Sequence, residues 1–432
     1  MAAQENRKYD LIVVGTGPGG ASVAREASRA GARVLMLERG GGAPFDGSHL
    51  QALDMMGRPG ANFMLTPQGL VVGRAFAVGG SSAINCASAF DPPLAMFEAR
   101  GVDLKSQVEE LRREVPIAPL EDSLVGAQAR LLSSAAQDLG YGWKPFNKFI
   151  YQDKCRTGCF LCYTGCPHGA KWTARNLAEE AVRNGADLIT RARVHRVVSK
   201  SGQAAGVTYS RLGRWNEVRA PKVVLAAGGL GTPVILEKTG ITGSGENFFF
   251  DPLIIAFGTV DSLPGTGEVP MTAGVHLPEE GIMLTDLSVH PSVYAMFTAQ
   301  MMRLDRLAAH KKTAGMMVKI RDELSGRLTA RGGIRKSMGP VDWKSLALGY
   351  AHAKRILSHA GAHHVFKSWY IAGHPGGTAK IGEVVNADLE TRMKNLYVCD
   401  CSVVPQAWGL PPSFTLAALG KRLGQHLTGK KD

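Results

Sequence analysis

The stretch that decides the fold runs from Tyr9 to Gly40 and reads YDLIVVGTGPGGASVAREASRAGARVLMLERG. Its first part, Tyr9 to Val14, contains a short continuous apolar run, which is typical of a strand buried on both faces of a parallel sheet. The following ASVAREASRAGA has alanine and valine at helical spacing, and Arg33 to Leu37 predicts a second strand. Together they predict a β-α-β unit of about 30 residues, and so an α/β fold.

The turn inside this unit carries a phosphate-binding pattern. Gly15, Gly17 and Gly20 form GxGxxG, in which the first glycine permits a tight turn, the second lets backbone approach a pyrophosphate and the third lets helix pack on strand. The helix N-terminus adds oriented N–H groups and a positive dipole end. Glu38 ends the second strand, where an acid accepts hydrogen bonds from an adenosine ribose and disfavours a 2′-phosphate. We therefore expect FAD or NAD in preference to NADP, although 52 glycines make a chance match to GxGxxG the alternative.

The middle of the chain returns to the same sheet. A threonine start and a glycine stop predict a helix over Thr173 to Ala186. Three short strands separated by turns, over 194–199, 204–210 and 216–220, predict a β-meander. The apolar run Lys222 to Pro233 then predicts another buried strand, so the dinucleotide-binding domain is expected to be discontinuous.

Four further stretches carry a family resemblance. They are VGGSSAIN at Val78 to Asn85, HPGGTAKIG at His374 to Gly382, NLYVCDCSVVP at Asn395 to Pro405 and PPSFTLAALGKRL at Pro411 to Leu423. With the opening stretch, and in the same order, they resemble the glucose–methanol–choline (GMC) oxidoreductase superfamily of FAD-dependent enzymes. The resemblance covers the flavin-binding parts and is weak in the substrate half.

The resemblance implies a fold class: α/β, with a Rossmann-like FAD-binding domain, a β-meander and a discontinuous α+β substrate domain. We expect the FAD-binding domain over 1–95, 151–254 and 371–432, with a cysteine-rich insert at 155–166. The substrate domain is expected over 96–150 and 255–370. At 432 residues the chain is short for this family.

The resemblance also implies FAD contacts. Adenine is expected near Val194 and the turn at Ala226 to Gly229, the isoalloxazine ring beside the VGGSSAIN loop, and the ribityl or phosphate region near Asp400. Thr415 would lie in the first turn of the final helix, whose N-terminus stabilises negative charge on the reduced ring. The expected cofactor-binding residues are Gly15, Gly17, Gly20, Glu38, Gly79, Gly80, Ser81, Asn85, Val194, Ala227, Gly228, Asp400 and Thr415.

His374 matches the catalytic histidine of the family. A hydride leaves a carbinol carbon only as the hydroxyl proton departs, so alcohol oxidation needs a base of near-neutral pKa. The alternative is that His374 is only a polar residue in a turn.

One departure from the family pattern is serious: the family usually has a second His or Asn where this chain has Pro411, which offers no side-chain donor or acceptor. Either Ser413, Tyr370, His363 or His364 takes over this role, or the enzyme is not a simple alcohol oxidase.

Four cysteines fall within twelve residues, at Cys155, Cys159, Cys162 and Cys166, followed by Pro167. The spacing C-x3-C-x2-C-x3-C-P resembles the end of a ferredoxin cluster motif and favours a [4Fe–4S] cluster. Structural zinc is the second interpretation, and reduced or disulfide-paired cysteines are the third. A cluster would connect FAD to a one-electron carrier instead of oxygen.

The net charge of +13 is concentrated late in the chain. The segment 303–355 holds thirteen Lys or Arg and four acids, a local excess of +9. It is interpreted as a solvated face, as a docking face for an acidic, ferredoxin-like electron carrier, or as a peripheral contact with a membrane. Nucleic acid is not expected as a partner, because no recognition motif accompanies the charge.

The sequence shows neither a secretory signal nor a long apolar run, so a cytoplasmic location is expected.

These features predict an FAD-dependent oxidoreductase acting on a small apolar substrate. The leading hypothesis is hydride transfer between a CH–OH carbon and flavin N5, with electrons relayed through a cluster to a non-oxygen carrier. The first rival is a reductase of C=C or C=O bonds driven by a ferredoxin-like donor. The second is an electron-transfer subunit whose partner performs the chemistry.

Overall fold

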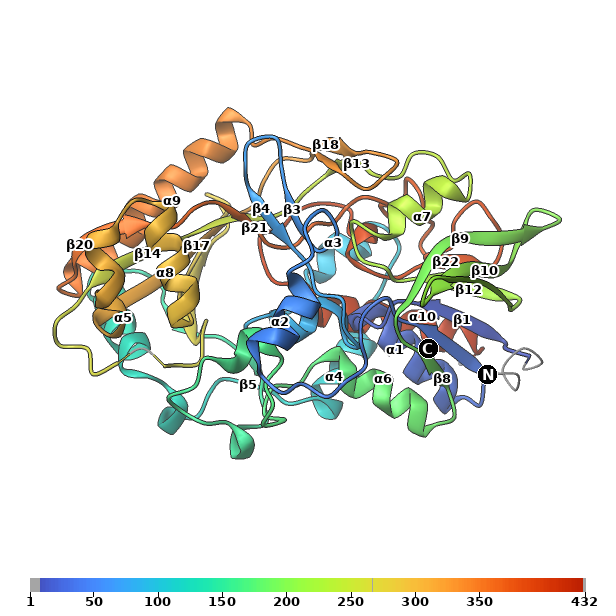
Figure 1. Ribbon diagram of the computed structural model, residues 1–432, viewed down its shortest axis with the longest axis horizontal. Coiled ribbons are helices and arrows are strands. Elements are labelled where there is room, and N and C mark those ends of the chain that lie inside the picture. Colours follow the sequence, from blue (N-terminus) through green and yellow to red (C-terminus); the bar gives the residue numbers. More distant parts are fainter. Residues whose placement is uncertain (1–7, 266, 430–432) are drawn as a thin grey trace.

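The computed structural model describes residues 8–265 and 267–429, and Figure 1 shows its elements gathered around two sheets. One sheet is parallel and holds the N-terminal β-α-β unit, and the other is larger and mixed. Within the described residues, no helix combines the length and the apolar character needed to span a bilayer.

The parallel sheet has five strands in the order β22-β12-β1-β2-β8. Their bounds are β22 Leu396–Val398, β12 Lys222–Leu225, β1 Leu11–Val14, β2 Val34–Leu37 and β8 Asp187–Ile189. The helix α1 (Pro18–Arg29) joins β1 to β2, which pair in parallel. The predicted β-α-β unit is therefore confirmed, as is the return of the chain to this sheet through β12, which pairs with β1.

Helices and a small antiparallel sheet cover this domain. The helices α6 (Ala174–Arg183) and α10 (Ser413–Leu427) pack against α1. Thr173 caps α6 as predicted. The strands β9 (Ala192–Lys200), β10 (Gln203–Arg211) and β11 (Arg214–Arg219) form the predicted meander.

The mixed sheet has nine strands in the order β3-β4-β21-β14-β17-β16-β15-β6, with β20 paired to β14. Their bounds are β3 Phe63–Leu65, β4 Val71–Gly73, β21 Ile371–Ala372, β14 Pro252–Thr259, β17 Thr313–Ile320, β16 Ile282–Asp286, β15 Ala273–Leu277, β6 Lys144–Pro145 and β20 His363–Lys367. The long helix α9 (Pro340–His359) packs on β17 and β14. The register pairs Leu253 of β14 with Lys319 of β17.

The remaining elements are short or peripheral. They are α2 His49–Met56, α3 Leu94–Glu98, α4 Lys105–Glu114, β5 Ile117–Ala118, α5 Ala127–Asp138, β7 Lys148–Phe149, α7 Thr232–Lys238, β13 Glu246–Phe248, α8 Pro291–Gln300, β18 Ser325–Leu328 and β19 Ile334–Arg335. Six 3-10 segments are η1 Gly80–Ile84, η2 Asp122–Leu124, η3 Gln152–Lys154, η4 Leu161–Thr164, η5 Leu304–Lys312 and η6 Cys401–Val403.

Candidate active site

A cavity of about 430 Å³ extends from the carboxyl ends of β1 and β2 to β17 in the mixed sheet. Most of the predicted site residues line it: Gly15, Gly17, Glu38, Gly80, Ser81, Asn85, Val194, Ala227, Gly228, His374, Asp400 and Ser413. Gly20, Gly79, Thr415 and Tyr370 do not line it. The cavity therefore brings together segments from the whole length of the chain.

The glycine loop forms the start of this cavity. Gly15 has a φ of +98°, and a Cβ there would lie 2.2 Å from the carbonyl oxygen of Ala226. A Cβ on Gly20 would lie 2.2 Å from the carbonyl oxygen of Gly15, so this glycine packs the helix onto the turn. The predicted reasons for glycine at these two positions thus have a direct structural basis.

Glu38 follows β2 and is hydrogen-bonded to the glycine loop that follows β1. Its Oε2 accepts hydrogen bonds from the backbone N–H of Thr16 at 3.0 Å and from the Thr16 hydroxyl at 2.6 Å, and its Oε1 accepts from the N–H of Gly40 at 2.7 Å. Burial raises the pKa of Glu38 above its usual value, while these hydrogen bonds oppose the change. Glu38 therefore fixes the turn as well as lining the cavity.

Asp400 lines the same cavity and lies in the turn after β22. One carboxylate oxygen accepts from the N–H of Gly228 at 2.8 Å and from the Thr232 hydroxyl, and the other accepts from the N–H of Ser402 at 2.8 Å. This carboxylate is buried, and burial raises its pKa. It joins the turn after β12 to the turn after β22.

Two arginines that the sequence analysis did not single out also line the cavity. The guanidinium carbons of Arg39 and Arg74 lie 4.0 and 5.0 Å from the centre of the Phe76 ring. Burial and the neighbouring cations lower the pKa of Arg39 to about 10 and that of Arg74 to about 9. Neither has a carboxylate within ion-pair distance in the part of the chain that the structure describes. Two uncompensated cations beside a glycine loop fit the anionic diphosphate of FAD.

The N-terminus of α10 meets the η1 loop at the cavity. The Asn85 side-chain amide donates to the Ser413 hydroxyl at 3.1 Å. Thr415, in the first turn of α10, is buried and does not line the cavity, and its hydroxyl has no hydrogen-bond partner among residues 8–265 and 267–429. The N-terminus of α10, with Ser413 lining the cavity, is consistent with a helix dipole that faces a bound cofactor.

His374 lies at the mixed-sheet end of the cavity, in contact with two buried charged groups. Its Nδ1 lies 3.1 Å from Oδ2 of Asp251 and 3.2 Å from Nζ of Lys319, and these two atoms are 3.4 Å apart. The side chains of Asp251 and Lys319 are 1% exposed and that of His374 is 27% exposed. With Nδ1 occupied, Nε2 is the ring nitrogen left for a substrate.

The charges around His374 favour the neutral ring. Burial and the positive charge of Lys319 lower the pKa of His374, while Asp251 opposes the change. Burial likewise lowers the pKa of Lys319, against the attraction of Asp251. A neutral imidazole held through Nδ1 is the form that can accept a proton.

Asp251 and Lys319 were not predicted from the sequence. Three of the residues expected to replace the polar group missing at Pro411 do not line the cavity: Tyr370, His363 and His364. The Tyr370 ring contacts Trp343, and its hydroxyl accepts from Lys367. His363 and His364 are exposed on β20. The missed residues do leave a signal in the sequence, because each is a single charge inside an apolar run: FFFDPLII for Asp251 and TAGMMVKI for Lys319. Charges in such runs are rarely tolerated without a partner.

The walls nearest His374 are mainly apolar. Leu253, Met271 and Met317 line the cavity there, together with Cys86 and Pro411. Proline at 411 therefore adds no polar group to this chamber. The chamber suits an apolar substrate carrying one reactive oxygen.

The four-cysteine segment gives no support to the predicted metal centre. All four thiols line one separate cavity, but its volume is about 20 Å³, which is room for about one water molecule. Among the described residues, no group of three or more His, Cys, Asp or Glu side chains is placed to hold a metal ion. The residues at Cys155, Cys159, Cys162 and Cys166 are unpaired thiols. Neither the [4Fe–4S] cluster nor the zinc alternative is supported by this arrangement.

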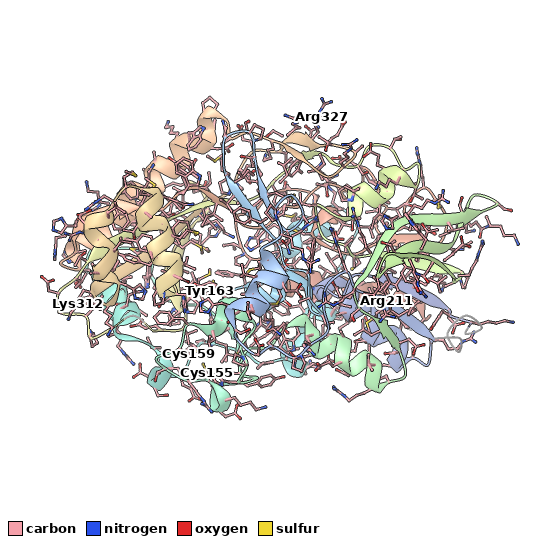
Figure 2. All side chains as sticks on the ribbon, viewed as in Figure 1. Cys155, Cys159, Tyr163, Arg211, Lys312 and Arg327 are labelled. Carbon is pink, nitrogen blue, oxygen red and sulfur yellow. The ribbon has the colours of Figure 1, made fainter. Side chains whose placement is uncertain are left out.

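The basic segment 303–355 has a buried part and a larger surface part. Lys319 and Lys336 are buried, and Lys336 pairs with Asp322 at 3.1 Å. Arg331 lines the main cavity. Two of the thirteen cations, Lys319 and Lys336, and two of the four acids, Asp322 and Asp342, are buried, so the other eleven cations and two acids keep an excess of +9 outside the core. Figure 2 shows side chains such as Lys312 and Arg327 at the periphery.

Several known proteins are similar to this chain in sequence or in fold. The chain is 29% identical to an uncharacterized GMC-type oxidoreductase of Mycobacterium tuberculosis, covering 98% of this chain and 76% of that protein. It is 24% identical to the Arabidopsis thaliana long-chain-alcohol oxidase FAO1, covering 94% of this chain and 65% of that protein. Its fold matches that of pyridoxine 4-oxidase from Mesorbium loti with a TM-score of 0.74 at 17% identity, covering 97% and 99% of the two chains.

The same fold occurs in Aspergillus oryzae formate oxidase, with a TM-score of 0.77, 15% identity and 98% of each chain covered. Residues 10–253 and 334–420 match the two family models described as GMC oxidoreductase. The cavity, its glycine loop and its uncompensated arginines are those expected of a flavin site. The chain therefore belongs to the GMC oxidoreductase family, and it is an FAD-dependent oxidoreductase.

Proposed function

We propose that this protein oxidises the CH–OH group of a small apolar alcohol, with His374 as the base that accepts the hydroxyl proton. The observation that carries the proposal is the His374 ring, held through Nδ1 by Asp251 at 3.1 Å and lining the same cavity as the glycine loop. Bound FAD would supply the acceptor for the hydride at flavin N5.

The chemistry of the chain's own residues supports this direction. Removing the hydroxyl proton at Nε2 of His374 raises the electron density on oxygen and lets hydride leave the adjacent carbon. Asp251 stabilises the imidazolium that then forms, as the acid of a catalytic triad does. The apolar walls formed by Leu253, Met271 and Met317 exclude water and hold the alkyl part of the alcohol.

The relatives support an alcohol substrate by their names alone. Four plant relatives are described as long-chain-alcohol oxidases, with 22–24% identity to this chain. A structural neighbour is described as pyridoxine 4-oxidase. We extend only the reaction class, CH–OH oxidation, to this protein.

The test is anaerobic flavin reduction. FAD-loaded protein is mixed with a series of primary and secondary alcohols, and the loss of oxidised-flavin absorption is followed for the wild type and for His374→Ala. We expect alcohols to bleach the wild-type flavin and the rate for His374→Ala to be lower by about 100-fold or more, with FAD still bound. Reduced protein is then exposed separately to oxygen and to an artificial one-electron carrier to identify the acceptor.

Two outcomes contradict the proposal. If dithionite-reduced protein is reoxidised by an enone or ketone while no alcohol bleaches the flavin, the protein is a C=C or C=O reductase. If reduction by an external carrier is unaffected in His374→Ala and no small molecule reacts, it is an electron-transfer subunit.

The four cysteines carry a second candidate, a [4Fe–4S] relay to a one-electron carrier. The observation in its favour is the charge beside the thiols: the buried ammonium groups of Lys148 and Lys171 each donate to three backbone carbonyls, and neither forms an ion pair with a carboxylate of the described chain. Such cations would balance thiolates. Because the cavity is too small for a cluster as it stands, our proposed reaction contains no step through one.

Metal analysis of anaerobically purified protein tests the relay. Stoichiometric iron and acid-labile sulfide, lost in Cys159→Ser, would support a cluster. Stoichiometric zinc would support the structural alternative, and the absence of both metals would leave four thiols.

A further inference from the structure

Lys319 differs from most buried lysines of the described chain because its acceptors do not fill its three N–H donors. Lys380 also has only two acceptors, the carbonyl of Glu246 and the carboxylate of Glu383, but it does not line the main cavity. Lys148 donates to the carbonyls of Cys86, Pro270 and Met271. The buried Lys336 and Lys421 likewise have three acceptors each. Lys319 lines the main cavity and has one acceptor, Asp251, because Nδ1 of His374 carries the ring proton when Nε2 is free to act as the base. Its remaining N–H groups are therefore available to a molecule in the cavity.

The strand that carries Lys319 explains why this side chain reaches the site. Residues 313–320 of β17 are all buried, and alternate side chains point to opposite faces of a strand. Met317 and Lys319 line the cavity, whereas Met316, Val318 and Ile320 belong to the apolar core on the other face. The sheet register places Lys319 beside β14, at whose start Asp251 lies.

The free-energy cost of burying the Lys319 side chain is offset by a single ion pair, with Asp251. Its ammonium is 1% exposed and pairs with Asp251 at 3.4 Å, which is longer than the usual hydrogen bond. The second oxygen of Asp251, Oδ1, is buried without a hydrogen-bond partner in the described chain. A pair made so loosely contributes little to folding, so the reason for a lysine here is better sought in the site.

We propose that Lys319 is a catalytic residue, whose ammonium donates a hydrogen bond to the substrate oxygen and supplies the polar group that Pro411 cannot. The inference rests on the proposed alcohol oxidation. As the O–H proton moves to Nε2 of His374 and the C–H hydride moves to flavin N5, the oxygen gains negative charge and then becomes the carbonyl oxygen of the product. Lys319 keeps its proton throughout and stabilises the charge on that oxygen.

The first test is chemical rescue of Lys319→Ala. We expect anaerobic flavin reduction to slow by about 100-fold or more, as when an oxyanion donor is removed elsewhere. Ethylammonium added to the solution should restore part of the rate saturably, because the deleted side chain leaves room for it. Lys336→Ala is the matched control: Lys336 is equally buried and pairs with Asp322 outside the cavity, so ethylammonium should not affect that variant.

The inference is overturned if Lys319→Ala binds FAD and reduces it at the wild-type rate, or if its lost rate is insensitive to every amine. If Lys319→Ala does not fold, Lys319→Gln takes its place. This variant keeps a donor but no charge, and an unchanged rate in it also overturns the inference.

A second measurement needs no turnover and separates this inference from the proposed function. Isobutyrate carries an oxyanion on a small apolar chain, and its binding is followed by the change in flavin absorption. We expect its Kd to rise about tenfold or more in Lys319→Ala and to be unchanged in Lys336→Ala. If this holds while no alcohol reduces the wild type, the alcohol reaction is wrong and the oxyanion site stands. An equal Kd in Lys319→Ala and wild type overturns the site.

Discussion

At the scale of single residues, the site depends on one histidine kept neutral by its surroundings. Burial and Lys319 both disfavour the imidazolium of His374, and Asp251 limits this effect. The pKa of the ring therefore lies below its usual value of 6.5. A base with this property is ready to accept a proton at neutral pH without first losing one.

The rate of flavin reduction should follow this pKa. Protonated His374 cannot accept the hydroxyl proton, so the rate should rise with pH and level off once the ring is neutral, with the midpoint below pH 6.5. Stopped-flow reduction between about pH 5 and 8 measures the profile. His359→Ala, which changes an exposed histidine, should leave the midpoint in place. A rate that falls as the pH rises, or a midpoint above pH 6.5, would contradict this role of His374.

At the scale of elements, the FAD site depends on how closely two helices approach. The helix α1 begins at the glycine loop and α10 begins at Ser413, so both N-termini face the cavity. A Cβ on Gly420 would lie 2.2 Å from the carbonyl oxygen of Gly19, and one on Gly424 would lie 2.6 Å from the Cβ of Glu26. Glycine at these two positions therefore sets the spacing of the two helices.

Gly420→Ala should weaken FAD binding. The added methyl group meets backbone, so α10 must move away from α1, and overpacking of this kind costs about 1–3 kcal/mol in stability. Flavin titration of the apoprotein and its thermal midpoint measure the two effects. Gly142→Ala is the control, because a Cβ there has no atom within 4 Å. Equal FAD affinity in Gly420→Ala and wild type would show that FAD binding does not depend on the close approach of α1 and α10.

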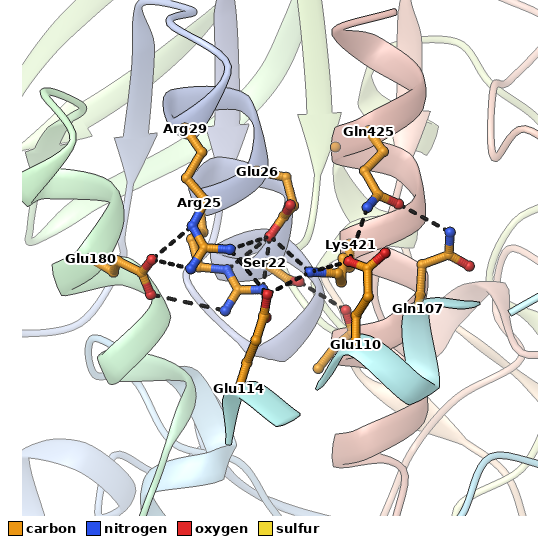
Figure 3. Close-up of polar contacts among 12 residues, drawn as sticks. Ser22, Arg25, Glu26, Arg29, Gln107, Glu110, Glu114, Glu180, Lys421 and Gln425 are labelled. Carbon is orange, nitrogen blue, oxygen red and sulfur yellow. Dashed lines mark hydrogen bonds and ion pairs between the residues drawn. The ribbon is translucent and has the colours of Figure 1, made fainter. Parts of the chain in front are cut away.

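At the scale of the whole molecule, a buried ion-pair network joins helices from distant parts of the chain, as Figure 3 shows. Lys421 of α10 lies 2.7 Å from Glu110 and 2.9 Å from Glu114, both in α4. Arg25 of α1 lies 2.6 Å from Glu114. Arg29 extends the network from α1 to α6 through Glu180. The network therefore ties α1, α4, α6 and α10 into one unit.

Lys421→Met should destabilise the protein by about 1–3 kcal/mol, because it removes one cation from the buried Glu26 and from the partly exposed Glu110 and Glu114, while Arg25 still pairs with Glu26 and Glu114. Burial raises the pKa of Glu114, but its contacts with Lys421 and Arg25 outweigh this and lower it to about 2. The stabilisation is thus present above the usual value of 4.5 and is lost as the pH falls towards 2.

Urea unfolding of Lys421→Met and wild type across this pH range measures the change. Lys105→Met, which removes an exposed pair with Glu98, should change the stability much less. A difference between Lys421→Met and wild type that does not shrink at low pH would contradict the role of Glu114.

The surface also carries a candidate contact with anionic bilayers. Met302, Leu304 and Leu307 are 78%, 57% and 43% exposed and lie among the basic residues that precede β17. Exposed apolar side chains interleaved with cations favour an anionic lipid surface. We expect sedimentation with phosphatidylglycerol vesicles to fall when these three residues are changed to serine.

Leu212→Ser is the control for the vesicle experiment, because Leu212 is 79% exposed on the meander, remote in sequence from η5. If the triple variant and Leu212→Ser sediment equally with the vesicles, the exposed apolar residues before β17 are not a membrane contact.

Local features of this fold were predictable because each depends on neighbours in the sequence. The apolar run before Gly15, the helix that follows and the strand ending at Glu38 form one β-α-β unit as expected. The Thr173 cap and the three meander strands are local in the same sense. Chain spacing alone also indicated four cysteines close together, and they do line one cavity.

The reaction centre itself was decided by tertiary structure. Asp251, Lys319 and His374 are 68, 55 and 123 positions apart in their three pairings, and the register of β14 against β17 brings the first two together. Sequence spacing contains no information about that register. For the same reason it could not show that the cysteine cavity holds about one water molecule, since the volume left between thiols depends on how distant segments pack around them.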